Sequence, residues 1–316
     1  YTIQEVIMGV FNYDYATNCN PIPPSEAALP TVTAEEFVKV SDKIPFHLEG
    51  ICFDKTGSTM YFCSTDIGRV FRLDMATKKV EQIWADEGLR SFGLKRHPDG
   101  RLFVCCFGTT RKPGIAILSS EGEELDFILE GHSLDDVIFA KDGSFYASEF
   151  TGNVYDRSGA VYHVSADGKT VTPFLQNLAA PNGVALSPDE SILWVTEYDA
   201  GQILRVPISG AYTSTVYHTT GFHGPDSCEI DADGNLYVAL TFQGRILILN
   251  RDGFPIGQIL TPGREVGRNL IGTHATVRPG TKEVYISCSD DTTDSGSWIL
   301  KSEGFAGACM DSYMYR

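Results

Sequence analysis

Apolar and polar residues alternate with a period of two along most of the chain, in short runs that turns separate. The segment at 224–239 shows one such unit, in which the turn Asp233, Gly234 and Asn235 precedes a run of apolar and aromatic residues. Glycine and proline interrupt the chain too often for long helices. The pattern therefore predicts an all-β protein.

The unit recurs six times, at intervals of about 45 residues. The recurring units start near residues 49, 92, 135, 182, 226 and 273. Each contains three strand-like runs and often a weaker fourth run, which predicts a six-bladed β-propeller over residues 31–316. Residues 1–30 are then an N-terminal extension. We expect residues 31–38 to supply an outer strand that closes the ring against the last blade, because propellers avoid open sheet edges.

Composition and charge narrow the functional classes. The chain has 316 residues, and no run of eighteen apolar residues that would span a membrane. Its first residues lack the basic and apolar segments of a secretory signal. The formal net charge of −16 disfavours nucleic acid and anionic membranes as partners. An acidic surface that keeps the protein in solution explains this charge, and a cation site is the second explanation.

The eight cysteines predict free thiols. None forms a C-x-x-C pair, and several lie within apolar runs, as Cys63, Cys105 and Cys106 do. Buried reduced thiols are typical of a cytoplasmic protein, whereas a secreted scaffold would use paired cysteines. We therefore expect a cytoplasmic protein that acts on a small molecule.

The residues that open the first strand of each blade point to a metal site. In a propeller this strand lines the central channel. The opening residues are Glu49, Phe92, Asp135, Asn182, Asp226 and Thr273. Converging carboxylates repel one another and lose hydration, so a cation is expected among them. Three carboxylates and one amide oxygen suit a hard divalent ion, most simply Ca²⁺. Taken singly, each residue also fits a surface or turn position, and their convergence favours the metal site.

Several segments carry a family resemblance. Three of them stand in order at blade starts: "LEGICFD" at 48–54, "APNGVALSPDESILWVTEY" at 180–198 and "GPDSCEIDADGNLYVA" at 224–239. With them the chain resembles the gluconolactonase, senescence-marker-protein-30 and regucalcin family of six-bladed propellers. The segments "GRILILNRDGFPIGQILTPGREVG" at 244–267 and "GTHATVRPGT" at 272–281 are most similar to the Drp35-type calcium-dependent lactonases of that family.

The resemblance implies a calcium-dependent lactone hydrolase with one catalytic ion. The matching motif positions imply that the ion is held by Glu49, Asp135, Asn182 and Asp226. Ser227 lies beside Asp226 as a further substrate contact. Close relatives also carry a second, structural Ca²⁺ near the third blade. Here the corresponding region contains Arg111 and Lys112, so we do not expect a second ion.

Hydrolysis of a lactone requires a polarised carbonyl and an activated water. A bound Ca²⁺ with open positions polarises the carbonyl, and a nearby carboxylate takes the proton of the water. We expect Asp226 to be this carboxylate, with Asp136 as the alternative. Asp136 is equally consistent with a hydrogen-bond acceptor that orients its neighbours. His223, His274 and Phe92 are expected to line the substrate pocket, although both histidines also fit packing roles.

Two other functions remain open at this stage. The same ligands would serve a phosphotriesterase, and a propeller is also a common non-enzymatic binding platform. The acidic column in the channel argues against the platform. The loops between blades build the substrate pocket and diverge freely, so the sequence does not identify the lactone.

Overall fold

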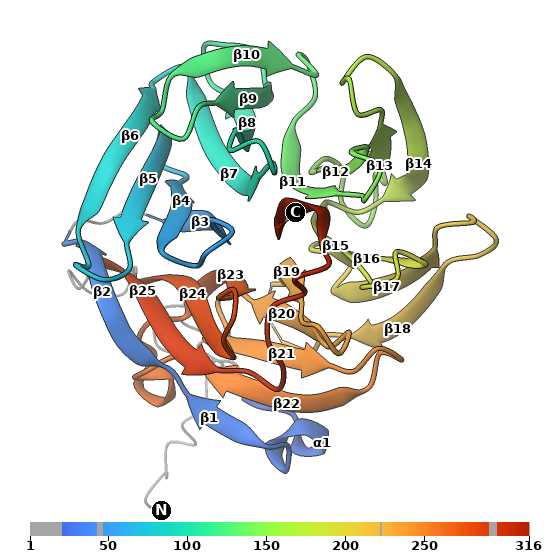
Figure 1. Ribbon diagram of the computed structural model, residues 1–316. Helices are drawn as coiled ribbons and strands as arrows, with labels where there is room; N and C mark the ends of the chain where they lie inside the picture. The colour runs from blue at the N-terminus through green and yellow to red at the C-terminus, as the bar shows by residue number, and fades with distance from the viewer. Residues whose placement is uncertain (1–20, 43–46, 222, 291–295, 316) are drawn as a thin grey trace, which may run out of the picture.

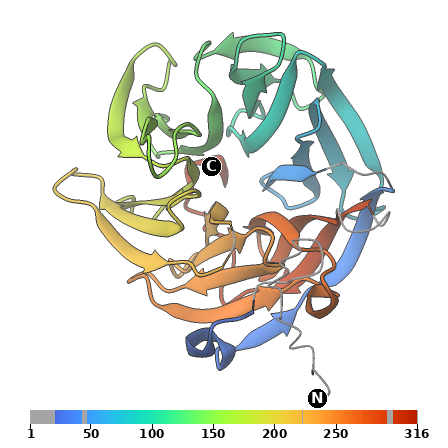
Figure 2. The ribbon, with the colours of Figure 1, turned by 180° about the vertical axis from the view of Figure 1, so that it is seen from behind.

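The computed structural model describes residues 21–42, 47–221, 223–290 and 296–315. Six sheets stand around a central axis (Figure 1), and the view from behind shows the same ring (Figure 2). The predicted six-bladed β-propeller is thus confirmed. Most of the proposed N-terminal extension, residues 1–20, lies outside the described residues.

The first three blades are antiparallel sheets whose strands run in sequence order from the axis outward. The first contains β3 (Leu48–Phe53), β4 (Thr59–Ser64), β5 (Gly68–Asp74) and β6 (Val80–Asp86). The second contains β7 (Leu89–Arg96), β8 (Leu102–Gly108), β9 (Gly114–Leu118) and β10 (Glu124–Ile128). The third contains β11 (Leu134–Phe139), β12 (Phe145–Glu149), β13 (Gly159–Val164) and β14 (Val171–Leu178).

The other three blades follow the same plan, and the last one borrows a strand. The fourth contains β15 (Pro181–Leu186), β16 (Ile192–Glu197), β17 (Gln202–Pro207) and β18 (Ser214–His218). The fifth contains β19 (Pro225–Ile230), β20 (Leu236–Leu240), β21 (Arg245–Leu249) and β22 (Pro255–Leu260). The sixth contains β23 (Ile271–Val277), β24 (Glu283–Asp290) and β25 (Gly296–Glu303).

Two N-terminal strands close the ring at its outer edge. β2 (Glu35–Ser41) pairs antiparallel with β25 and completes the sixth blade, as expected for an outer closing strand. β1 (Thr31–Thr33) instead pairs in parallel with β22 of the fifth blade. The segment expected to close one blade therefore covers the edges of two, which leaves neither β22 nor β25 open.

The inner strands meet at one level of the axis through glycine. A Cβ on Gly50 would lie 2.2 Å from the carbonyl oxygen of Phe92, and one on Gly93 would lie 2.3 Å from that of Asp135. A Cβ on Gly183 would lie 2.5 Å from the amide nitrogen of Cys228. These contacts have no room for a side chain. In every blade the pairing of the first two strands also shifts register near this level, as in a β-bulge.

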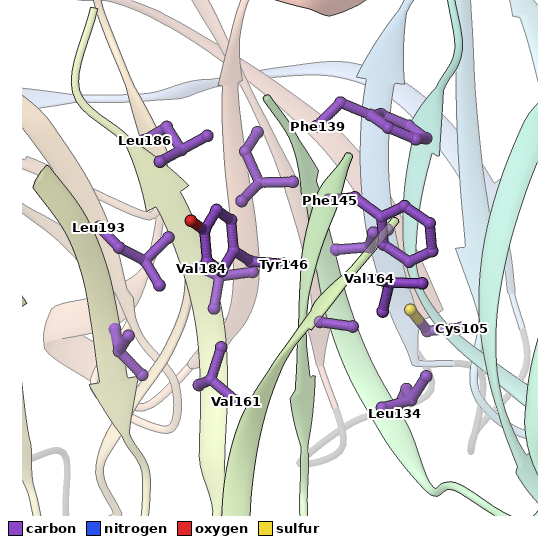
Figure 3. Close-up of a cluster of buried hydrophobic side chains, with 14 of the residues drawn as sticks. Cys105, Leu134, Phe139, Phe145, Tyr146, Val161, Val164, Val184, Leu186 and Leu193 are labelled. Atoms are coloured by element: carbon purple, nitrogen blue, oxygen red, sulfur yellow. The ribbon is translucent and has the colours of Figure 1, made fainter. Parts of the chain in front are cut away.

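Apolar side chains fill the space between neighbouring blades. One cluster joins the second, third and fourth blades, and Figure 3 shows Phe139, Phe145 and Val184 among its members. On the strands β8, β9, β16 and β17 the members occupy alternate positions, which accounts for the period of two there, whereas β11 and β12 contribute consecutive residues because both of their faces are buried. Burial of each such side chain stabilises the fold by about 1.5–3 kcal/mol.

The C-terminal segment ends at the axis (Figure 1). After β25 it is tied to the fifth blade, where the amide of Ala232 donates to the carbonyl oxygen of Gly307 at 2.9 Å. Met314 and Tyr315 are buried and share a small cavity with Glu229 and Ile230, at the end of β19. The segment therefore lies at the opposite end of the inner strands from Asp226, which stands at the start of β19.

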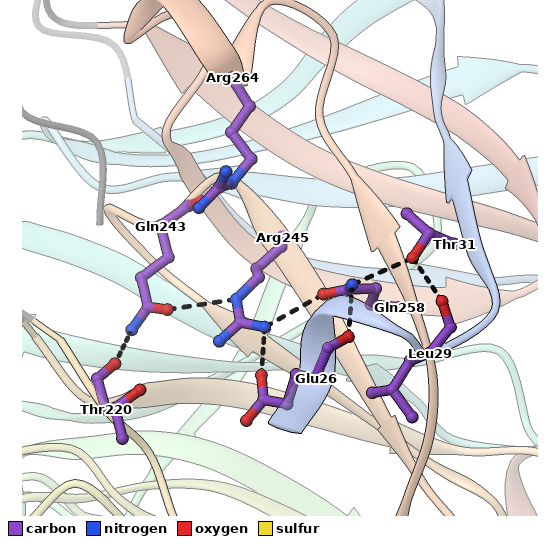
Figure 4. Close-up of polar contacts among 8 residues, drawn as sticks. All are labelled: Glu26, Leu29, Thr31, Thr220, Gln243, Arg245, Gln258 and Arg264. Carbon is purple, nitrogen blue, oxygen red and sulfur yellow. Dashed lines mark hydrogen bonds and ion pairs between the residues drawn. The ribbon is translucent and has the colours of Figure 1, made fainter. Parts of the chain in front are cut away.

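A buried ion pair fastens the first described residues to the fifth blade. Glu26 lies in α1 (Pro24–Ala27), and its carboxylate contacts the guanidinium of Arg245 on β21 (Figure 4). Arg245 also donates to the side-chain oxygens of Gln258 and Gln243, at 3.1 and 3.2 Å. Both charged side chains are almost fully buried. Removing one partner would leave the other charge buried without compensation.

We expect Arg245→Met to lower the free energy of unfolding by ~3–5 kcal/mol, because it leaves the Glu26 carboxylate buried and unpaired. The double variant Glu26→Leu, Arg245→Met should recover much of this loss. Lys112→Met is the control, because it removes an ion pair with Glu130 that lies in solvent. Denaturant unfolding measures all three variants, and an equal loss for Arg245→Met and Lys112→Met would contradict the expectation.

Candidate active site

Four predicted ligands line one cavity at the axis. Each of the four residues stands at or near the start of the inner strand of its blade. They are Glu49 on β3, Asp135 on β11, Asn182 on β15 and Asp226 on β19. The cavity has a volume of about 170 Å³. Between 3% and 6% of the surface of each residue is exposed. The structure therefore gathers these four residues from separate blades around one cavity, with most of their surface buried.

The three carboxylates interact electrostatically. Burial raises the pKa of Glu49, Asp135 and Asp226 well above the ordinary carboxyl value. The next cause is mutual repulsion: Asp226 raises the pKa of Glu49, Glu49 that of Asp135, and Asp135 that of Asp226. Each group therefore binds its proton more tightly than in water, unless a positive charge is supplied.

The donor set fits a hard cation by two criteria. All four side chains offer oxygen atoms, which Ca²⁺ prefers. In addition, Oδ1 of Asp135 is buried without a hydrogen-bond partner among the described residues. A buried unpaired oxygen is rare in native proteins and marks a missing partner. Among the described residues, no group of three or more acidic, histidine or cysteine side chains is arranged so that it could hold a metal ion as it stands. The four residues are therefore candidate ligands by their donor chemistry and shared cavity, and not by a preformed ligand geometry.

Aromatic side chains form one wall of the cavity. Phe92, Phe150, Tyr198 and Phe242 line it, and successive ring centroids are close: Phe107 lies 4.1 Å from Phe92 and 6.0 Å from Phe150. The ring of Phe150 meets that of Tyr198 edge to face at 5.7 Å. Phe92 was predicted at this site, whereas the other rings were not.

The sequence does contain a signal for part of this wall. Thr65, Phe150, Tyr198 and Thr241 each directly follow the second strand of their blade, and all four line the cavity. They form a second column of equivalent positions, beside the column of ligands. Its chemistry is mixed, so it lacks the obvious character of an acidic column.

Asp136 lies beneath the cavity and is fully buried. Its two carboxylate oxygens accept hydrogen bonds from the amides of Val137 and Val184, at 2.8 and 3.3 Å. Burial raises its pKa to about 6, and the positive charge of Lys95 opposes that rise. Asp136 therefore joins the inner strands of two blades and does not line the cavity.

A buried ion pair that the sequence analysis missed lies deeper along the axis. Nζ of Lys95 lies 2.9 Å from Oε2 of Glu229 and 3.4 Å from Nε2 of His274. An ammonium group only donates, so Nε2 accepts and His274 carries its proton on Nδ1. Burial lowers the pKa of His274 well below its ordinary value, which agrees with a neutral ring. Lys95 comes three residues after Phe92, and Glu229 three residues after Asp226, which were both predicted to open inner strands. This equal spacing was the only feature of the sequence that could have indicated the pair.

The remaining predicted substrate contacts, His274, Ser227 and His223, do not line this cavity. His274 is fully buried below it, beside Lys95. Ser227 is also buried, and its amide donates to Oδ1 of Asp226 at 3.1 Å. His223 stacks on Phe242 with ring centroids 4.1 Å apart. It lines a neighbouring hollow of about 470 Å³ that shares Tyr198 with the cavity.

Basic side chains occupy the region where the sequence resemblance raised the question of a second ion. Arg111 contacts Asp86 at 2.8 Å and Glu124 at 2.7 Å. Lys112 lies 2.8 Å from Glu130. The acidic groups of this region are therefore neutralised by the chain itself.

The described residues contain seven cysteines, and all seven are buried free thiols. Burial raises the pKa of Cys52 and Cys106 to about 12, so both stay protonated at neutral pH. Among the helices in the described part of the chain, none has the length and apolar character needed to cross a membrane.

We expect the stability of the metal-free protein to fall as the pH rises. The pKa values of Glu49, Asp135 and Asp226 are higher in the folded state than in the unfolded state. Their contribution is therefore complete below the ordinary carboxyl pKa and is lost as the pH rises through the raised values. Denaturant unfolding at several pH values, with and without Ca²⁺, measures this effect.

Ca²⁺ should stabilise the protein more at high pH than at low pH, because the ion binds the ionised carboxylates. Asp135→Asn is the matched variant and should flatten the pH dependence of the metal-free protein. A metal-free stability that rises with pH across this range would contradict the proposed clustering of charge.

Comparisons with known proteins agree with this fold. A profile described as the SMP-30/Gluconolactonase/LRE-like region matches residues 49–276. A protein named lactonase drp35 from Staphylococcus saprophyticus is 42% identical over 298 residues, which cover 90% of this chain and 91% of that protein. Its namesake from Staphylococcus aureus strain USA300 is 39% identical over 306 residues, which cover 92% and 94%.

Solved structures share the propeller at lower identity. A luciferin-regenerating enzyme aligns with a TM-score of 0.69 and 20% identity, over 87% of this chain and 98% of that one. A calcium-binding protein, regucalcin, from Agrobacterium tumefaciens aligns with a TM-score of 0.68 and 17% identity, over 88% and 98%. These structures support the fold alone. Because the profile covers most of the chain and two relatives exceed 30% identity over nearly all of it, the chain belongs to the SMP-30/gluconolactonase/LRE-like family.

Proposed function

We propose that the protein is a metal-dependent lactonase, which hydrolyses a cyclic ester to a hydroxy acid. The observation that carries this proposal is the cavity in which three buried carboxylates and one amide converge from four blades. Membership of the family, and the name lactonase of two relatives, favour lactone hydrolysis as the reaction. The fold alone would also suit a binding platform, which has no need of converging acidic groups.

Glu49, Asp135, Asn182 and Asp226 are the residues that would hold the ion. Their oxygen donors favour Ca²⁺ over zinc, which prefers nitrogen and sulfur. When bound, the ion supplies a positive charge that stabilises the carbonyl oxygen of the lactone as it becomes negative. One ion is proposed, because Arg111 already pairs with Asp86 of the first blade and Glu124 of the second.

Asp226 is the group that we assign to accept the proton of the attacking water. It lines the cavity, and the amide of Ser227 holds its Oδ1 in place at 3.1 Å. Asp136 has both oxygens engaged by backbone amides and does not line the cavity. We therefore assign Asp136 to positioning the strands that carry Asp135 and Asn182, and not to proton transfer.

The walls of the cavity suit a small, flat and uncharged substrate. Phe92, Phe150 and Phe242 offer apolar surface, and they limit the access of bulk water to the reacting ester. The product is a carboxylate, which the acidic lining and the overall net charge of −16 repel. Repulsion therefore favours release of the hydroxy acid. We also propose a cytoplasmic location, which the seven buried free thiols of the described residues support, because reduced thiols persist in a reducing compartment.

Metal stripping is the decisive experiment. We expect the stripped protein to lose hydrolysis of γ- and δ-lactones, and Ca²⁺ to restore it better than Mg²⁺, Mn²⁺ or Zn²⁺. An organophosphate triester, assayed in parallel, tests phosphotriesterase activity at the same site. Faster turnover of the triester than of every lactone would replace the proposal by that activity, and lactone hydrolysis that survives stripping would overturn the role of the metal.

Substitutions separate an enzyme from a binding platform. Glu49→Gln and Asp226→Asn should each lower kcat/KM for lactones by roughly 10²-fold or more, because each removes a charge that catalysis requires. Asp233→Asn, in the exposed turn between β19 and β20, is the matched control and should retain full activity. If neither site variant changes turnover, the channel carboxylates have no catalytic role.

A further inference from the structure

We propose that the Tyr198 hydroxyl donates a hydrogen bond to the lactone oxygen that becomes negative, and that His223 positions this hydroxyl. This inference deepens the proposed lactonase function and depends on it. Tyr198 directly follows β16, in the column of residues after the second strands. Neither the acidic column nor the metal requires it, so its place in the cavity needs a separate explanation.

Tyr198 shares the cavity with the reacting groups. It is half-buried and lines the same cavity as Asp135 and Asp226. The ring of Phe150 meets the Tyr198 ring edge to face at 5.7 Å, which limits how far the Tyr198 ring can turn. Tyr198 also lines the neighbouring hollow that contains His223, so it stands at the boundary between that hollow and the cavity.

The backbone also holds Tyr198 in register with Asp226. The amide of Tyr198 donates to the carbonyl oxygen of Ala180 at 3.0 Å, just before the strand of Asn182. On its other side, a Cβ on Gly224 would lie only 1.7 Å from the carbonyl oxygen of Tyr198. Gly224 is two residues before Asp226. The tyrosine is thus packed between the backbones that present two of the candidate ligands.

His223 fixes the hydroxyl from the outer side. Nδ1 of His223 lies 2.8 Å from the Tyr198 hydroxyl oxygen. When Nδ1–H donates to that oxygen, the hydroxyl proton is free to point into the cavity, where a substrate oxygen would accept it. His223 is itself held by Phe242, whose ring stacks on it at 4.1 Å.

Two neighbouring residues at this point adopt strained backbone conformations. His223 has φ of 62° and Phe242 has φ of 59°, in the left-handed region that bulky residues avoid. Such strain costs about 1–3 kcal/mol per residue and persists where the surroundings impose it, commonly at functional sites. Here it places the two stacked rings beside Tyr198, which agrees with a positioning role.

The protonation states agree with donation. Burial, and then the charges of Asp226, Asp199 and Asp135, raise the pKa of Tyr198, so the hydroxyl keeps its proton at neutral pH. Burial lowers the pKa of His223, so its ring is neutral. A neutral ring donates through Nδ1–H without placing a positive charge beside the metal site.

Tyr198→Phe tests the hydroxyl while it keeps the ring and its contact with Phe150. We expect kcat for lactones to fall roughly 10²-fold, as for the loss of one oxyanion donor, and KM to rise about five- to tenfold, because the hydroxyl also binds the neutral carbonyl oxygen. Calorimetric affinity for Ca²⁺ should stay the same, because Tyr198 is not among the ligands. Tyr162→Phe is the matched control, since its hydroxyl donates to Oε2 of Glu149 at 2.9 Å outside the cavity. Equal kcat for Tyr198→Phe and Tyr162→Phe would overturn the inference.

His223→Asn tests the positioning role, because asparagine tolerates the left-handed conformation and is too short to reach the hydroxyl. We expect a lower kcat in the wild-type background and no further loss in the Tyr198→Phe background. If the two substitutions instead multiply their effects on kcat, His223 acts independently of Tyr198 and this part of the inference is overturned.

A binding measurement separates this inference from the proposed function. δ-Valerolactam keeps the ring and carbonyl of a lactone and resists hydrolysis. We expect the Ca²⁺-loaded wild type to bind it about five- to tenfold more tightly than Tyr198→Phe does. If the wild type hydrolyses no lactone, the proposed function fails, and the lactam affinities still decide about Tyr198. Equal affinities of the two proteins would overturn the hydrogen bond.

Discussion

Backbone contact between the inner strands is the constraint on which this protein depends. At one level of the axis, Gly50, Gly93 and Gly183 let neighbouring strands approach until no Cβ would fit between them. Side chains next to these glycines therefore converge on the axis from different blades. Glu49 and Asn182 immediately precede two of them, and Asp135 provides the carbonyl oxygen that Gly93 approaches. The close approach that orders the ring also concentrates its negative charge.

This concentration of charge opposes folding, and other parts of the molecule compensate for it. The apolar clusters between blades stabilise the ring through burial that does not involve the residues of the site. Beneath the carboxylates, Lys95 brings a positive charge into the axis, and Glu229 pairs with it at 2.9 Å. At the periphery, the Glu26 and Arg245 pair fastens the chain start to the fifth blade. The site is thus a locally unfavourable region within a stable frame.

The repeats predicted the propeller and the acidic column because both follow from strand order, which a period of about 45 residues reveals. Residues whose role depends on local geometry were not predicted. Lys95 and Glu229 meet only because two inner strands from separate blades are in register below the bulges. Tyr198 lies at the end of a second strand, and only the fold shows that this position faces the cavity. His274 was predicted to line the pocket, but it follows Thr273 on β23 and its side chain is buried in the axis beside Lys95.

The position of the C-terminal segment determines how substrate and product reach and leave the cavity. Within the described residues, Met314 and Tyr315 are buried at the end of the axis opposite Asp226, where they obstruct the channel. Substrate and product then enter and leave through the same mouth of the cavity, on the side of Asp226. The carboxylates of the cavity repel an anionic product toward this mouth, so its departure frees the cavity for the next substrate molecule.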